Sequence, residues 1–183
     1  MIHVRLGRLE EMVVPAYMRP VASDFSPVTP AMRRLDDAAG DRVRDQLRRG
    51  GELPVGSATI TPAGNLPADF LVSIVVRSVD EPVTPAAVER GLVNGLRRLR
   101  EWAIDMAATV PLGTGAGNLD AETSARLMIT TLRQEMAPDT LPRDIVIVVE
   151  TEYEKQAFDK ALRTQEDLPV LDPGDDGEEG MRG

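Results

Sequence analysis

The stretch AATVPLGTGAGNLDAETSARLMITTL, residues 107–132, decides the fold because it sets three glycines between an apolar segment and an amphipathic one. Residues 107–112 predict a short strand, and the apolar residues that follow the glycines recur at helical spacing. Gly113, Gly115 and Gly117 would let the backbone approach a ligand closely and turn N–H groups outward at a helix N-terminus. That arrangement suits a phosphate.

The glycine loop is not specific when it is taken alone, since a tight turn explains such a pattern equally well. It lacks the Lys-Ser or Lys-Thr of a P-loop and the glycine spacing of dinucleotide folds. The side chains of Thr114 and Asn118 either donate hydrogen bonds to a ligand or satisfy the turn backbone. The predicted ligand-binding residues are Gly113, Thr114, Gly115, Ala116, Gly117 and Asn118.

Apolar patterning on either side of the loop predicts that strands alternate with helices. Each expected helix follows a capping residue, and the first is expected to run as far as Gly50-Gly51. The expected caps are Thr29, Thr84, Asp120 and Thr151, the last in a capping box with Glu154. The expected strands cover residues 2–6, 12–14, 57–61, 70–76, 107–112 and 144–149. This order predicts an α/β protein, a three-layer α/β/α domain around a largely parallel sheet.

Length and charge predict one domain over residues 1–165 and an acidic, flexible tail over 166–183. The chain has 183 residues and a net charge of −9, and the tail holds seven acidic residues against Arg182 alone. The rest is only mildly acidic and offers no basic stripe, which disfavours nucleic acid. No apolar run is long enough to span a membrane, so we expect a cytoplasmic protein. With no cysteine and one histidine, His3, we assign no cofactor, metal ligand or catalytic residue.

The surroundings of the loop resemble the macro domain family. Macro domains carry a strand, a proline, Gly-Thr-Gly and a further glycine at this point, as residues 107–117 do here. GSATITPAGNLPADFLVSIVV (56–76) and VIVVETEYEKQAFDKAL (146–162) resemble other segments of the family, so the likeness covers about residues 7–162. It implies a mixed sheet between helices and ADP-ribose as the usual ligand, with its diphosphate against the glycine loop.

The first third of the chain departs from the family pattern. Gly7-Arg8-Leu9 stands where the resemblance implies Gly-Asp-Ile or Gly-Asp-Val, whose aspartate holds adenine. Residues 19–22, Arg-Pro-Val-Ala, replace the Asn-Ala-Ala-Asn that contacts the distal ribose. VTPAMRRL (28–35) replaces a triple-glycine stretch, with Met32 where some hydrolases carry an acid. One wall of the implied cleft is therefore rebuilt with larger side chains.

Two simpler interpretations concern charged residues in this altered part. Arg8 and Arg19 could together form a site for an anionic ligand, although isolated surface arginines are the commoner case. Asp36 and Asp37 are expected to form solvated ion pairs with Arg33 and Arg34 on a helix face.

The resemblance and the departures leave three functions open. The first is a degenerate binding module for a nucleotide or phosphorylated metabolite, with ADP-ribose bound weakly. The second is a structural or oligomerising domain with no ligand, and a homo-oligomer is left open. An ADP-ribosyl hydrolase ranks third.

Overall fold

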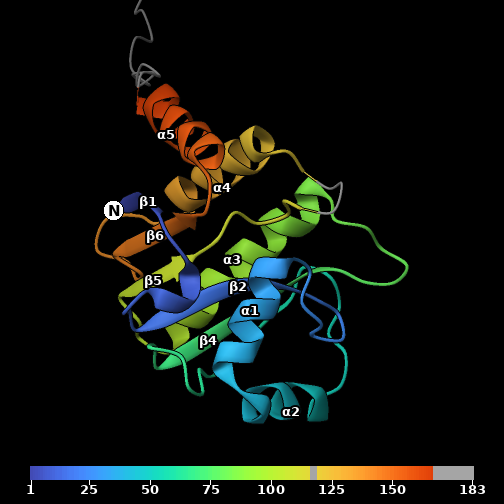
Figure 1. The fold of residues 1–183 in the computed structure, drawn as a ribbon. Helices are drawn as coiled ribbons and strands as arrows, with labels where there is room; N and C mark the ends of the chain where they lie inside the picture. The colour runs from blue at the N-terminus through green and yellow to red at the C-terminus, as the bar shows by residue number, and fades with distance from the viewer. Residues whose placement is uncertain (116–118, 167–183) are drawn as a thin grey trace, which may run out of the picture.

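A six-stranded mixed sheet forms the middle of the protein in the computed structural model, which describes residues 1–115 and 119–166 (Figure 1). The strand order is β1-β6-β5-β2-β4-β3, and every pairing is parallel except the antiparallel pair of β3 and β4. The strands are β1 (Ile2–Leu6), β2 (Ala16–Ala22), β3 (Ala58–Pro62), β4 (Phe70–Arg77), β5 (Met106–Thr109) and β6 (Asp144–Val149). The predicted largely parallel sheet is confirmed.

Helices cover both faces of the sheet, which confirms the three-layer α/β/α prediction (Figure 1). Alternate residues of β6 show the two sides: Ile145 and Ile147 pack in the core under α3, α4 and α5, whereas Val146 and Val148 pack in the core under α1 and α2. The helices are α1 (Pro30–Ala39), α2 (Asp41–Arg49), α3 (Pro85–Glu101), α4 (Ala121–Glu135) and α5 (Glu152–Glu166), with a 3₁₀ turn η1 (Leu9–Glu11) after β1.

Strand β2 was not predicted, and the strand expected over residues 12–14 is wrong. The residues of β2 are all buried, but the arginine at 19 and the proline at 20 hide this in the sequence. Pro20 is tolerated because β2 pairs with β5 only as far as Met18, so Pro20 lies beyond that pairing and opposite Ile74 of β4.

The helix expected from residue 30 to Gly50 is two helices. Gly40 separates α1 from α2 with a φ of 90°, and a Cβ there would lie 2.9 Å from the Asn65 amide nitrogen. Left-handed backbone and close contact both favour glycine, so the chain turns at this residue.

The predicted helix caps are confirmed at all four positions. The side chains of Thr29, Thr84 and Asp120 accept the backbone N–H of the third residue of α1, α3 and α4, respectively. Thr151 and Glu154 bond reciprocally before α5, as a capping box requires. No helix among the described residues is long and apolar enough to cross a membrane. Residues 167–183, nearly all of the predicted tail, lie outside the described residues.

Candidate functional site

The sheet has a topological switch point between its neighbouring strands β2 and β5. The chain leaves β2 toward α1 on one face and leaves β5 toward α4 on the other face (Figure 1). Parallel sheets bind ligands in the crevice that this divergence opens at the carboxyl ends of the strands. The two segments that meet there are residues 23–29 and the glycine loop after β5.

The glycine loop folds back on itself after β5. The Leu119 N–H donates to the Gly113 carbonyl at 2.9 Å, and the Thr114 hydroxyl lies 3.4 Å from the Pro111 carbonyl oxygen. Gly113 has a φ of 81°, and a Cβ there would lie 2.9 Å from side-chain atoms of both Leu119 and Val88. Glycine at 113 is therefore required by backbone and packing together.

The glycine loop meets the start of α1 directly. Gly115 has a φ of 90°, and a Cβ added there would lie 2.9 Å from the Thr29 Cγ2. The structure thus brings three of the predicted ligand-binding residues, Gly113, Thr114 and Gly115, to the switch point. The other three, Ala116, Gly117 and Asn118, lie outside the described residues.

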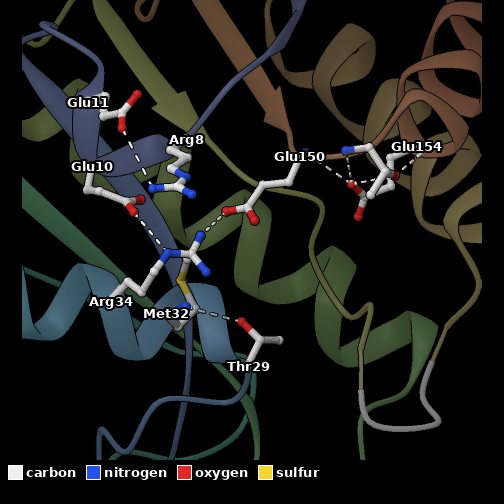
Figure 2. Close-up of polar contacts among 9 residues, drawn as sticks. Arg8, Glu10, Glu11, Thr29, Met32, Arg34, Glu150 and Glu154 are labelled. Atoms are coloured by element: carbon white, nitrogen blue, oxygen red, sulfur yellow. Dashed lines mark hydrogen bonds and ion pairs between the residues drawn. The ribbon is translucent and has the colours of Figure 1, made fainter.

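Three helices that begin near this edge of the sheet are capped by their own side chains. The Thr29 Oγ1 accepts the Met32 N–H at 3.2 Å, and the Asp120 carboxylate accepts the Thr123 N–H at 2.7 Å. At α5 the Glu154 carboxylate accepts the N–H groups of the two residues before the helix (Figure 2). Hydrogen bonds from Thr123 also lower the pKa of Asp120, which keeps that cap anionic. Capping side chains therefore already occupy the N-termini of these three helices.

Arg34 bridges two carboxylates beyond the ends of β1 and β6 (Figure 2). Its Nε donates to the Glu10 carboxylate at 3.1 Å, and its Nη2 donates to the Glu150 carboxylate. The hydrogen bond that Arg34 donates to Glu10, together with the charge of Glu150, raises the pKa of the Arg34 guanidinium. Arg8 lies beside the bridge and pairs with Glu11, at 4.0 Å. Sequence reasoning missed the bridge because its members come from three distant parts of the chain.

A comparison of the sequence with models of known protein families agrees with this geometry. The model of the family described as Macro domain matches residues 31–128. The chain belongs to the macro domain family. A macrodomain mutant of Oceanobacillus iheyensis with ADPR superposes with a TM-score of 0.80 at 14% identity, over 90% of this chain and 93% of that chain. A Trypanosoma brucei macrodomain in complex with ADP-ribose gives 0.78 at 13% identity, over 88% and 68%.

Sequence relatives of this macro domain are distant. An uncharacterized protein of Mycobacterium tuberculosis is 26% identical over 130 residues, which cover 71% of this chain. The chain spans about a third of that relative's length, 36%. An O-acetyl-ADP-ribose deacetylase of Citrobacter koseri is 23% identical over 172 residues, which cover 91% of this chain and 97% of the relative.

Arg19 is buried, so neither the alternative of an anion site formed by Arg8 and Arg19 nor the simpler interpretation of Arg19 as a surface residue is right. The Arg19 side chain is 1% exposed and lies between the sheet and α1. Its Nη1 donates to the Asp36 carboxylate, and its Nε donates to the Ser73 hydroxyl at 3.1 Å. Burial lowers the pKa of the Arg19 guanidinium, and the charge of Asp36 opposes that shift.

The solvated ion pairs expected for α1 are also wrong. Asp36 is buried against Arg19, while Asp37 pairs with Arg44 at 3.6 Å. Arg34 reaches away from both aspartates to the bridge with Glu10. The charged side chains Arg34, Asp36 and Asp37 of α1 therefore form ion pairs with other elements, namely η1, β2 and α2.

Two altered positions of this macro domain are apolar and lie inside the core. Ala22 ends β2, and Met32 is 1% exposed in the first turn of α1, at the positions where the resemblance implies an asparagine and, in some hydrolases, an acid. Across residues 1–115 and 119–166, no three acidic or histidine side chains come close enough together to hold a metal ion.

Proposed function

We propose that this macro domain binds a nucleotide or phosphorylated metabolite, ADP-ribose among them, through the backbone of residues 113–118. The observation that carries the proposal is the pair of left-handed glycines, Gly113 and Gly115, at the switch point against the start of α1. Positive φ and the absence of side chains let peptide N–H groups face an anion at short range. Structural neighbours described as holding ADP or ADP-ribose support the ligand class.

The affinity is expected to be modest. The helix N-termini beside the loop are capped by Thr29, Asp120 and Glu154, and Asp120 adds a negative charge close to where the anion would bind. The triple-glycine wall that the resemblance implies is replaced by residues 28–35. We expect a dissociation constant on the order of 0.1–1 mM, or roughly 4–5.5 kcal/mol.

Calorimetry with phosphate, diphosphate, ADP and ADP-ribose tests the site. Gly115→Val should abolish binding, because a β-branched side chain fits neither the φ of 90° nor the contact with Thr29. Gly51→Val is the matched control, since Gly51 also has a positive φ, 76°, but a Cβ there would meet nothing within 4 Å. It should lose some stability and keep the wild-type affinity.

Each result of this experiment has a definite meaning. If Gly115→Val folds and binds all four compounds like wild type, the proposed site is refuted. If the wild-type protein binds none of them at millimolar concentration, the proposal fails and a structural domain without a ligand is the better interpretation.

We further propose that this macro domain does not hydrolyse ADP-ribose derivatives. Ala22 and Met32 offer no amide and no carboxylate to orient a water or a ribose. Release of ADP-ribose from ADP-ribosylated protein, and of acetate from O-acetyl-ADP-ribose, should equal that of a heat-killed control. Measurable release above that control would contradict this part of the proposal.

A further inference from the structure

A hollow of about 670 Å³ lies at the amino ends of β1 and β6, at the opposite end of the sheet from the glycine loop. Three segments enclose it: the start of β1 at Ile2 and His3, residues 136–143 after α4, and Leu162 of α5. Nothing in the proposed nucleotide site uses these residues. The hollow is a separate surface of the protein.

The wall of the hollow combines apolar side chains with polar and charged ones, two arginines and Asp139 among them. Met136, Pro138, Pro142 and Leu162 supply apolar surface, and Arg133 and Arg143 supply positive charge. Such a surface suits a segment that combines apolar and acidic side chains.

Hydrogen bonds beside and within the wall hold the segments around the hollow in place. Arg100 donates from Nε to the Leu141 carbonyl at 3.0 Å and from Nη2 to the Glu135 carbonyl at 2.7 Å. Arg133 donates to the Leu162 carbonyl at 2.8 Å, which ties α4 to α5. Because these hydrogen bonds already order the wall of the hollow, binding of a segment there requires little further ordering of the wall.

The chain itself supplies a segment of the matching composition close by. Leu162, in the wall, is four residues before the end of α5 at Glu166, or about 6 Å along the helix. The sequence continues with DLPVLDPGDDGEEGMRG, in which Leu168, Val170 and Leu171 precede a run of acidic residues. Composition alone predicts no core within this segment, but the hollow offers its apolar residues a place to be buried.

We propose that residues 167–183 dock into this hollow in cis, with the apolar residues 168–171 against Met136 and Leu162 and the acidic residues facing Arg133 and Arg143. Attachment one helical turn from the wall gives the segment an effective concentration on the order of millimolar, so a weak intrinsic affinity suffices. The segment covers the amino end of the sheet and leaves the glycine loop at the other end accessible.

The absence of cysteine makes a direct test simple. Gly174→Cys in the full chain carries a nitroxide label, and its relaxation effect is measured at backbone amides. The label should broaden the backbone amides of His3, Ala137, Asp139, Thr140 and Arg143, and should leave those of Ser23 and Gly113 sharp. Equal broadening at both ends of the sheet would overturn the proposal.

Charge variants and dilution complete the test. Arg143→Glu should reduce the broadening about threefold, as should about 0.5 M NaCl, because charge attraction holds the acidic part of the segment. Arg97→Glu, an equal change at an exposed position of α3, should leave it unchanged. Identical effects of the two variants, or broadening that disappears on dilution because it comes from a second copy, would each refute docking in cis.

Discussion

Removing the carboxylate of Asp36 should destabilise the protein far more than its place on a polar-looking helix suggests. The change Asp36→Leu leaves the Arg19 guanidinium buried without its counter-charge, while its hydrogen bond to the Ser73 hydroxyl remains. Breaking one side of a buried ion pair costs about 3–5 kcal/mol of unfolding free energy. With a urea m-value of about 2 kcal/mol per M, the unfolding midpoint should fall by about 1.5–2.5 M.

The double variant Arg19→Met/Asp36→Leu separates the charge from the packing. With both charges replaced by apolar side chains, the unfolding free energy should return to within about 2 kcal/mol of wild type. Part of the remaining loss reflects the Ser73 hydroxyl, which loses its partner.

The assay is urea unfolding followed by the fluorescence of Trp102, the one tryptophan. Trp102 is 53% exposed, and its ring packs on Phe70 with centroids 5.2 Å apart, so unfolding changes its surroundings. Asp37→Leu is the control, because Asp37 is exposed and its pairing with Arg44 contributes less than about 1 kcal/mol. Equal midpoint shifts for Asp36→Leu and Asp37→Leu would refute the reasoning.

Two further predictions concern stability near the site. Gly115→Ala should lower the unfolding free energy by about 1–3 kcal/mol more than Gly51→Ala, because both glycines have positive φ but only a Cβ at Gly115 meets Thr29. Adding Thr29→Ser to Gly115→Ala should recover part of the difference. Melting temperatures measured without ligand test this, and equal losses for the two alanine variants would argue against the contact. Burial, with the charge of Glu10, raises the pKa of Tyr17 to about 12, above the value of about 10 for an unfolded chain. The neutral phenol therefore contributes stability that is complete below pH 10 and is lost as the pH rises toward 12, so unfolding free energy should fall less steeply over that range in Tyr17→Phe than in wild type; equal slopes would contradict the assignment.

Much of the fold was predictable because local signals agree with it. The strand β6 begins and ends as predicted, since its run of β-branched residues is bounded by Asp144 and Glu150. The helix caps were predictable from Thr29, Thr84 and Asp120, because capping depends on residues three apart in sequence.

The parts that could not be predicted depend on contacts between distant residues. From the sequence, Arg19 is expected at the surface. Its burial is possible because Asp36 of α1 lies against it and neutralises its charge. Arg19 and Pro20 together concealed β2, and Arg19 with Arg8 suggested an anion site. The bridge of Glu10, Arg34 and Glu150 has no local pattern for the same reason.

The pairing of β1 with β6 has a consequence for synthesis of the chain. Ile2 pairs with Ile145, and Leu6 pairs with Val149, so the first strand has no neighbour until the last one has been made. At about 5–20 residues per second, the ribosome needs roughly 7–30 s to cover the interval. During that time β2, β4 and β5 can assemble, while Ile2 and Val4 remain uncovered. The last step of folding is therefore closure of the sheet at β1 and β6, and chaperones have the longest access to the N-terminal strand.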